Sequence, residues 1–586
     1  MTERPHVPTA RLGGRFITRY PVRYAINAIG WAGMWVMPVL PALITKQFFD
    51  RITGETDAGF TIGSLVALMV AYGVGRISWM VFGMWNDQHL GFRIASLMRR
   101  NMLERIFELP GARAMEESPG EAISRFRDDV DETVESFSWT VDMIGIAAFS
   151  GVALWILLSI DARITVFVFG PTVAVVWIAA AFRKRIKRYR EAAREATGRI
   201  TEALGETFGA VQSIKVAGAE RSMIGHFRRL NDARRIVMVK DKVLTSMLES
   251  VFWNTLSVGT GLILIVAASG IRSGEFTIGE FSVFVYFLGW VTDAVFFLGL
   301  FVARYQQAAV SFGRMVELMG DTDPMRLARA ADLHLTGPLP EPEVIPLGVT
   351  PLEELRVEGL TYHYPGTSAG IEDVSFTLPR GSFTVVTGRI GAGKTTLLRT
   401  LLGLLPADEG RIVWNGEEVE DPATFFVPPR SAYTPQVPRL FSMSLLDNLL
   451  MGRRDPEEHV YEAISSAVME PDLDHMPEGL ATMVGPLGVR LSGGQVQRSA
   501  TARMFVRRPD LLVFDDVSSA LDVETERILW ERLFREHGGV TSLVVSHRRP
   551  ALRRADQIVV MEDGRVAAAG SLDEVQGVPA FDEIWE

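Results

Sequence analysis

The sequence predicts an all-α transmembrane domain of six helices followed by an α/β P-loop domain, and three observations carry this prediction. At 586 residues the chain is too long for one ordinary domain. Long apolar stretches fill its first half, whereas short apolar runs between polar turns fill its second. Between them lies GPLPEPEVIPLGVTP, which predicts a linker because proline interrupts helices and central strands. We expect the membrane domain in residues 1–320, the linker in 321–352 and the second domain in 353–586.

The composition excludes several kinds of function. Hydrophobic residues make up 48% of the chain, and the formal net charge of −10 argues against nucleic acid as a partner. The chain has no cysteine, which rules out disulfides, thiolate metal sites and cysteine nucleophiles. We expect no cleavable signal peptide, because the first apolar run lacks a small-residue cleavage pattern.

The six membrane spans are predicted from length and hydrophobicity. A bilayer core about 30 Å thick requires about 20 mostly apolar residues in a spanning helix. Stretches of this kind cover residues 22–49, 60–84, 137–160, 164–182, 251–271 and 278–302. Long buried helices of a soluble protein are the alternative, and six of them in one half of a chain would be hard to bury.

The orientation is predicted from the basic residues of the connections. GFRIASLMRRNMLERIF and RKRIKRYREAAREATGR lie on one side, and the short acidic DRITGETDAG lies on the other. Because basic connections stay in the cytoplasm, we expect the N-terminus and the second domain there. The preceding RLGGRFITRYPVRY suits an interfacial helix, or else the basic inner flank of the first span.

The strongest motif of the chain is FTVVTGRIGAGKTTLLRTLLGLL, at residues 383–405. An apolar strand leads into a glycine-rich loop and then a helix, which is the context that a phosphate-binding loop requires. The loop N–H groups and the helix N-terminus would hold phosphate oxygens. We expect Lys394 to reach the β- and γ-phosphates and Thr395 to bind Mg²⁺.

Two further motifs extend this site. LLVFDDVSSALD is an apolar strand that ends in Asp515 and Asp516, and Asp515 is placed to bind Mg²⁺. Ser-Gly-Gly-Gln at residues 492–495 precedes a helix and forms a second anion-binding end. One chain offers no second phosphate to it, unless it faces the nucleotide of another chain.

Taken together, these motifs resemble those of the ATP-binding cassette (ABC) transporters, and the chain resembles an exporter-type half-transporter with six spans and one cassette. LSGGQ matches the family signature, YTPQ the loop that carries Gln436, and VVSHR the switch histidine, here His547. Tyr364 in YHYPG stands where the family stacks an aromatic ring on adenine, and Asp522 in SSALD stands in the loop between cassettes.

The resemblance implies a role for each candidate residue. The catalytic candidates are Asp516 and His547, and the metal ligands are Thr395, Gln436 and Asp515. The candidates for binding ATP are Tyr364, Gly388, Arg389, Ile390, Gly391, Ala392, Gly393, Lys394, Thr395, Thr396 and Gln436. The signature residues that would act on the partner's ATP are Ser492, Gly493, Gly494 and Gln495, and Asp522 would lie between the cassettes.

The resemblance also implies partners and an activity. Two cassettes would pack head to tail, with each ATP between one phosphate loop and the other signature, so a second half-transporter is required. Residues 124–132 and 208–219 match in position the family's coupling helices. The activity would be ATP- and Mg²⁺-dependent export of drugs, lipids or peptides across a bilayer, in bacteria the inner membrane. A siderophore importer and a non-transporting regulatory membrane ATPase are the alternatives.

Two departures from the family pattern concern hydrolysis and coupling. The residue after the metal-binding aspartate is usually glutamate, and here it is Asp516, with the same charge and a shorter reach. Before the signature, Pro486-Leu487-Gly488 replaces the usual Glu-Arg-Gly. Slow hydrolysis beside an intact signature predicts one subunit of a heterodimer rather than a slow homodimer. Arg76 and Asp293, inside the second and sixth spans, either pair with each other or line a cavity.

Overall fold

The structure is a computed structural model that describes residues 8–55, 59–111, 118–320, 323–340, 351–486, 488–537 and 539–585, without some side chains of α7, α9 and α17. The chain forms two compact units. The helical unit comprises Met1–Met102 and Gly120–Leu333, and the cassette unit comprises Leu103–Pro119 and His334–Glu586.

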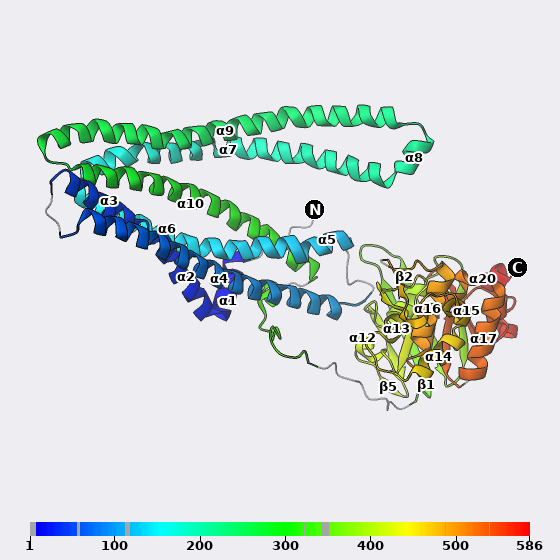
Figure 1. Cartoon of the computed structure of the whole chain (residues 1–586). Coiled ribbons are helices and arrows are strands. Elements are labelled where there is room, and N and C mark those ends of the chain that lie inside the picture. The colour runs from blue at the N-terminus through cyan, green and yellow to red at the C-terminus, as the bar shows by residue number, and fades with distance from the viewer. Residues whose placement is uncertain are drawn as a thin grey trace. The chain divides into compact units, whose positions relative to one another are not determined.

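The helical unit contains long helices joined by short turns (Figure 1). Its elements are α1 (Thr9–Arg19), α2 (Pro21–Val36), α3 (Val39–Ile52), α4 (Ile62–Glu108), α5 (Pro119–Ser124), the π-helix η1 (Arg125–Asp129), α6 (Val130–Ile160), α7 (Ala162–Gly209), α8 (Val211–Val216), α9 (Glu220–Ser273), α10 (Ile278–Leu318) and the 3₁₀ helix η2 (Pro324–Ala328). Helix α6 packs against α2 and α10, α10 also packs against α3, and α7 pairs with α9. This packing confirms the predicted all-helical membrane unit.

Four stretches of the described residues are long and apolar enough to span a membrane: Pro21–Ile52, Ile62–Glu108, Pro119–Ile160 and Ile278–Leu318. The first, third and sixth predicted spans lie within these stretches, and the second, 60–84, overlaps Ile62–Glu108 from residue 62 onward. The fifth prediction falls on the shorter apolar stretch Ser257–Arg272 of α9. The fourth lies in the helical backbone of α7, but most of its side chains are outside the described set.

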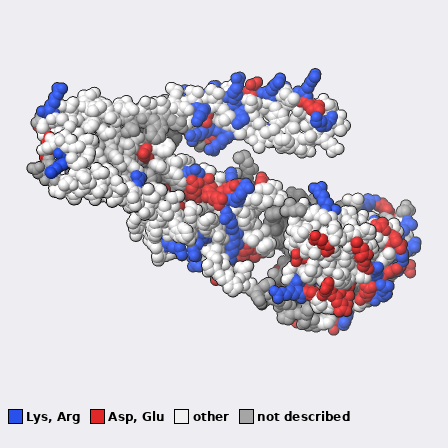
Figure 2. All heavy atoms as spheres, viewed as in Figure 1, with Lys and Arg blue, Asp and Glu red and all other residues white. Residues whose placement is uncertain are grey.

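The outer surface of α4 explains why this unit suits a bilayer. Val66, Val70, Val74, Ile77 and Val81 recur every three or four residues, and each is more than half exposed. Because residues at this spacing share one helix face, they form an apolar stripe that water would not stabilise. Figure 2 shows broad surface without charged side chains on the helical unit, whereas acidic and basic side chains crowd the cassette unit.

Helices α7 and α9 are much longer than a bilayer crossing. At about 1.5 Å per residue, the 48 residues of α7 extend roughly 72 Å and the 54 residues of α9 roughly 81 Å. The short α8 joins their ends (Figure 1) and occupies the second predicted coupling segment. The first predicted coupling segment falls mainly on η1, a π-helical turn of the kind often found at functional positions. The coupling role of both segments stays a prediction.

The cassette unit is built on a six-stranded sheet and a four-stranded sheet. Its strands are β1 (Glu354–His363), β2 (Gly370–Pro379), β3 (Phe383–Gly388), β4 (Glu409–Trp414), β5 (Glu417–Glu418), β6 (Ser431–Thr434), β7 (Met443–Ser444), β8 (Met483–Val484), β9 (Leu511–Asp515), β10 (Thr541–Val545), β11 (Gln557–Glu562) and β12 (Arg565–Gly570). The larger sheet has the order β12-β11-β3-β10-β9-β6, and all its neighbours except β12 pair in parallel.

In the described residues of this unit, ten helices accompany the sheets, and several of them are labelled in Figure 1. They are α11 (Lys394–Leu401), α12 (Pro422–Phe425), α13 (Leu445–Leu450), α14 (Glu457–Ser466), α15 (Glu470–Asp474), α16 (Gly493–Phe505), α17 (Val523–His537), α18 (Arg549–Leu552), α19 (Leu572–Val575) and α20 (Pro579–Trp585). Two 3₁₀ turns, η3 (Gly479–Ala481) and η4 (Val517–Ala520), complete the unit. The unit has the α/β fold that the sequence predicted.

The two faces of the six-stranded sheet carry different helices. In β9, Leu511 and Val513 join a buried cluster with α11 and the four-stranded sheet, whereas Leu512 and Phe514 join a cluster with α13, α14, α16 and α17. The same alternation holds in β3, β10 and β11, because successive strand side chains point to opposite faces. Helices α11 and α16 therefore lie on opposite faces of one sheet.

Candidate functional site

The phosphate loop joins the buried strand β3 to α11. Gly388, Gly391 and Gly393 all have positive φ angles, of 150°, 88° and 94°. A Cβ at Gly388 would lie 2.3 Å from the Met561 carbonyl oxygen, so a larger residue does not fit there. Gly393 caps α11 without a side-chain hydrogen bond, which leaves the helix N-terminus available to an anion. Ala392 is buried, whereas Ile390 at the tip of the loop is fully exposed.

Lys394 bends back over the loop. Its Nζ donates to the carbonyl oxygens of Gly388 at 2.7 Å and Arg389 at 2.8 Å. Burial lowers the pKa of Lys394, while the nearby carboxylates of Asp516 and Asp515 oppose that shift. The ammonium group is therefore held over the loop by weak carbonyl acceptors, which a phosphate oxygen could replace with a stronger charge-assisted hydrogen bond. The neighbouring Arg389 pairs with Glu583 of α20.

Asp515 ends β9 beside the first turn of α11. Its Oδ1 accepts a hydrogen bond from Thr395 Oγ1 at 3.0 Å, and its Oδ2 accepts one from Tyr433 OH at 3.2 Å. Burial raises the pKa of Asp515, and these two donors partly oppose the rise. The structure thus brings together Thr395 and Asp515, two predicted metal ligands that lie 120 residues apart. Tyr433 was not predicted, and its role depends on the pairing of β6 with β9.

Asp516 has an unusual backbone and an incompletely bonded side chain. Its φ angle is 52°, a left-handed conformation that aspartate adopts more readily than most residues. Gln436 Nε2 donates to Asp516 Oδ2 at 3.2 Å. Asp516 Oδ1 is buried and has no hydrogen-bond partner in the described part of the chain. Because a buried carboxylate oxygen without a donor is costly, this atom is available for a water molecule or another donor at the site.

His547 follows β10 and is exposed, while Ser546 beside it is buried. The next residue, Arg548, donates to Glu526 Oε2 at 2.6 Å, and the Glu526 side chain is only 1% exposed. Arg548 also donates to the Leu521 carbonyl oxygen at 3.3 Å. This contact connects the histidine loop to the loop that carries Asp522, and the sequence analysis did not predict it.

Asp522 and Tyr364 occupy different edges of the cassette. Asp522 Oδ1 accepts from the backbone N–H groups of Glu524 and Thr525, so it caps the start of α17. Thr525 chiefly lowers the pKa of Asp522 through its side-chain hydrogen bond. Tyr364 lies just after β1, and its hydroxyl is 3.3 Å from Thr396 Oγ1 on α11. That position places the tyrosine ring beside the helix that follows the phosphate loop.

The signature begins α16. Ser492 and Gln495 form a capping box, in which Ser492 Oγ accepts from the Gln495 N–H at 3.3 Å and Gln495 Oε1 accepts from the Ser492 N–H at 2.8 Å. Asp472 accepts from Gln495 Nε2 and makes two hydrogen bonds with Arg498. A Cβ at Gly493 would meet nothing within 4 Å, so this helix start presents open space.

The turn before the signature includes the second departure from the family pattern. Gly488 N donates to the Gly485 carbonyl oxygen at 3.1 Å, and a Cβ at Gly488 would lie 2.3 Å from the Met483 carbonyl oxygen. This turn therefore requires glycine. Leu487 lies outside the described residues.

The donor set fits ATP and Mg²⁺. Thr395, Asp515 and Gln436 offer hydroxyl, carboxylate and amide oxygens, the ligand types that Mg²⁺ prefers. The open N-terminus of α11 and the Lys394 ammonium offer positive partial and full charges to phosphate. Fold and site together define a membrane-embedded P-loop protein.

Comparison with known proteins identifies the family. The family described as "ABC transporter transmembrane region" matches residues 27–295, and the family described as "ABC transporter" matches residues 371–519. The two matches together cover more than half of the chain. The chain therefore belongs to the ABC transporters, has the exporter-type architecture and carries their ATP-binding ATPase domain, as the motifs predicted.

Individual relatives agree with this assignment. The "Probable multidrug resistance ABC transporter ATP-binding/permease protein YheI" of Bacillus subtilis (strain 168) is 30% identical over 391 residues, which are 64% of each chain. An "ATP-dependent lipid A-core flippase" of Xylella fastidiosa (strain Temecula1 / ATCC 700964) is 26% identical over 92% of this chain and 89% of the relative. A solved structure, "Structure of a bacterial Atm1-family ABC exporter with ATP bound", has a TM-score of 0.76 at 20% identity, over 97% of this chain and 98% of that one. This likeness confirms the fold.

Proposed function

We propose that the chain is one half of a dimeric exporter that uses ATP to move amphipathic molecules, such as drugs, lipids or peptides, across a bacterial inner membrane. The N-terminus and the cassette would be cytoplasmic, as the basic connections predict. The names of two relatives, a multidrug transporter and a lipid flippase, support an amphipathic cargo. The exposed apolar stripe of α4 supports a position within the bilayer.

Different residues of the cassette would bind the phosphates, hold Mg²⁺ and orient the attacking water. Lys394 and the loop N–H groups would bind the β- and γ-phosphates, with the adenine ring stacked on Tyr364. Thr395, Gln436 and Asp515 would hold Mg²⁺, which neutralises charge that develops on the phosphates. Asp516 would orient the attacking water through Oδ1, the oxygen that Gln436 leaves free, and His547 would contact the γ-phosphate.

The separation of α11 and α16 carries the proposal that two chains are needed. The phosphate loop and the signature lie with their helices on opposite faces of the six-stranded sheet. Since a side chain cannot reach around a sheet whose faces are both covered, Ser492 would act on a nucleotide held by a second cassette. Asp522, exposed at the start of α17, would lie between the two cassettes.

We infer that the partner is a different half-transporter. Asp516 carries the charge of glutamate on a side chain shorter by one methylene, and a misplacement of about 1 Å can reduce a rate roughly 10²-fold. The ATP-binding residues are intact, so the site on this chain's own phosphate loop would bind ATP well and hydrolyse it slowly. The complete signature would serve a faster site on the partner.

The experiment is a copurification followed by a transport assay. The tagged chain is expressed alone and together with the half-transporter encoded beside it, and each product is reconstituted into vesicles. We expect ATP-dependent movement of a fluorescent lipid or dye only from the mixed complex. Full activity of the chain alone would contradict the heterodimer. Movement toward the side of the membrane that carries the cassettes would indicate an importer. ATPase activity without any movement of the lipid or dye would indicate a regulatory ATPase.

A further inference from the structure

A cavity of about 580 Å³ lies in the helical unit between α1 and η2. Its described lining is Arg15, Thr18, Arg19, Asp323, Met325, Arg326, Ala328, Arg329 and Ala330. Four of these residues are arginine and one is aspartate, so the formal charge of the lining is +3. This volume lies within the range of small-ligand pockets. The proposed binding and hydrolysis of ATP give the cavity no role.

The walls of the cavity are fixed by packing on their other sides. Phe16 of α1 is fully buried and contacts the rings of Phe137 and Phe312, with centroid distances of 5.6 and 6.4 Å. Asn101, 2% exposed on α4, donates to the carbonyl oxygens of Leu327 and Arg329 at 2.9 Å each. Because both walls are anchored, the backbone positions from which the arginines extend are set before any ligand arrives.

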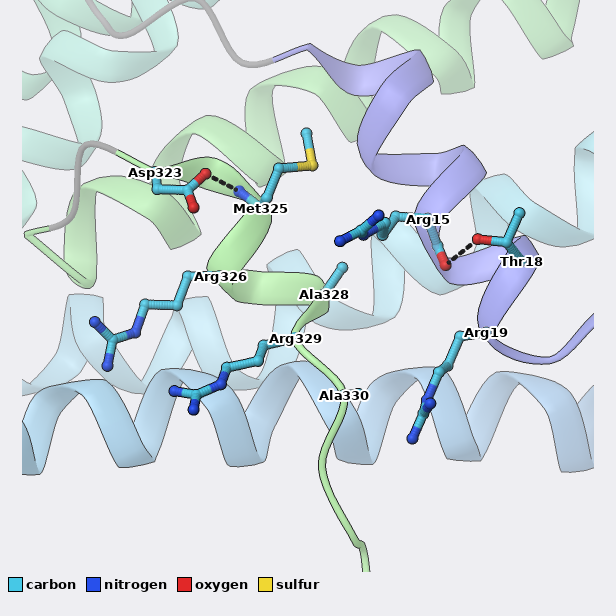
Figure 3. Close-up of a pocket in the computed structure, with 9 residues that line it drawn as sticks. All are labelled: Arg15, Thr18, Arg19, Asp323, Met325, Arg326, Ala328, Arg329 and Ala330. Atoms are coloured by element: carbon cyan, nitrogen blue, oxygen red, sulfur yellow. Dashed lines mark hydrogen bonds between the residues drawn. The ribbon is translucent and has the colours of Figure 1, made fainter.

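The charge of the cavity is not neutralised from within. In the part of the chain that the structure describes, the side chains of Arg15, Arg19 and Arg329 make no ion pair and no hydrogen bond. Asp323 Oδ1 accepts from the Met325 N–H, so part of its hydrogen-bonding capacity serves the start of η2. Figure 3 shows Arg15 extending from α1 toward η2, with Arg19 and Arg329 on either side of the space between them. Guanidinium groups stay charged at all physiological pH values, so the site attracts an anion.

The place of α1 in the chain indicates where such an anion comes from. Only Tyr20 separates α1 from Pro21, where the first apolar stretch begins. Arginines one or two turns before a span lie at the level of lipid headgroups, and basic residues there attract anionic lipids. The planar guanidinium matches a phosphate group with two parallel hydrogen bonds.

We propose that this arginine cavity binds a phosphate group, and that the phosphate belongs to the headgroup of an anionic phospholipid. The bound headgroup bridges α1, which precedes the first membrane span, and η2, which precedes the linker to the cassette. A free phosphate ion offers the same chemistry without the acyl chains, and the test separates these two sources.

The test measures ligand binding to the purified, delipidated complex by native mass spectrometry. The probes are dioctanoyl phosphatidylglycerol, dioctanoyl phosphatidylcholine as the lipid without net charge, and inorganic phosphate. We expect phosphatidylglycerol to bind at least tenfold more tightly than phosphatidylcholine. The double substitution Arg15→Gln and Arg329→Gln should weaken that binding at least tenfold, and the double substitution to Lys should weaken it less.

Arg11→Gln is the matched control. Arg11 is exposed on the same helix, one turn before Arg15, and does not line the cavity. The Arg11→Gln substitution should change the affinity for phosphatidylglycerol less than twofold. An equal loss in Arg11→Gln and in the double variant, or equal binding of the two lipids, would overturn the site. If inorganic phosphate competes fully at millimolar concentration and phosphatidylglycerol binds no better than phosphate, the lipid source is wrong.

Discussion

Helix α11 follows Gly393, whereas α16 begins with Gly493 and Gly494, and the two helix N-termini are capped differently. At α11 the cap is Gly393, which supplies no side-chain hydrogen bond, and Lys394 rests on carbonyl oxygens of its own loop. At α16 a capping box between Ser492 and Gln495 satisfies the N–H groups of these two residues. The start of α11 is open to a ligand within its own chain, whereas the start of α16 is fixed by its own cap and faces open space at Gly493. The partial positive charge at a helix N-terminus can therefore bind a ligand within its own chain or complete the site of a neighbouring chain.

The largest effect should come from filling the open space at the signature. Gly493→Leu places a side chain where a Cβ meets nothing in this chain, so the fold should tolerate it. A partner's nucleotide at the same place would clash, and we expect the ATPase rate of the complex to fall by roughly 10²-fold or more. The measurement is steady-state phosphate release, beside the melting temperature of the complex.

Gly539→Leu is the control for this substitution, because Gly539 is also exposed with nothing near its Cβ position. It should leave the rate unchanged. If Gly493→Leu turns over ATP at the rate of the unchanged complex, the α16 surface does not complete the fast site.

The next largest effect is expected from a substitution at the N-terminus of α11, which is open to a ligand. Lys394→Ala removes the ammonium that would bond to phosphate, and a lost hydrogen bond to a charged group costs about 1.5–3 kcal/mol. We expect ATP affinity at this site to fall roughly ten- to hundredfold. Photolabelling with an azido-ATP analogue, read on this chain alone, measures it. Arg411→Ala removes an exposed cation elsewhere in the cassette and should change nothing. Unaltered labelling of Lys394→Ala would refute the phosphate-loop assignment.

A gain-of-function substitution tests whether the reach of Asp516 accounts for the difference in hydrolysis between this chain's site and the partner's. Asp516→Glu should raise hydrolysis at this site, by up to roughly 10²-fold, without tightening ATP binding, because charge is kept and only reach changes. The gain is limited because glutamate adopts the left-handed backbone of this position less readily than aspartate. Single-turnover hydrolysis is compared after the catalytic glutamate of the partner has been inactivated. Equal rates for Asp516 and its Glu substitution would mean that reach does not limit this site.

The smallest effect concerns the tyrosine that orients the metal ligand. Tyr433→Phe removes the hydroxyl that donates to Asp515 Oδ2, a hydrogen bond whose net contribution is about 0.5–1.5 kcal/mol. Because Thr395 still holds Oδ1, we expect the Mg²⁺ concentration at half-maximal ATP binding to rise only about two- to tenfold. Tyr461→Phe, an exposed tyrosine of α14, is the matched control. No difference between the two variants would show that Tyr433 does not orient Asp515.

The structure contradicts one of the two interpretations of Arg76 and Asp293. A role of these residues in lining a cavity stays a prediction, but the expected ion pair between them is absent from the described residues. Arg76 instead donates to Tyr72 OH at 3.2 Å and lies over the Trp290 ring, 5.3 Å from its centroid. A guanidinium can be stabilised by an aromatic face, a partner that charge counting along a sequence does not reveal.

The sequence by itself determined the features that depend on neighbouring residues. The phosphate loop is one continuous strand, loop and helix, and the signature cap needs only Ser492 and Gln495, three positions apart. The apolar stretches that predict spans are likewise local, because a helix crossing a bilayer must be apolar along its own length. The roles of single residues, such as Asp516 in hydrolysis, stay predictions.

The tertiary structure alone decided what depends on residues far apart. Gln436 meets Asp516 across 80 positions, Tyr433 meets Asp515 across 82, and the arginine cavity joins α1 to η2. The placement of α11 and α16 on opposite faces follows from which strand residues point each way once six strands have paired. Strand pairing and helix packing bring such groups together through hydrophobic burial, which has no direction along the chain and leaves no local pattern that a sequence could show.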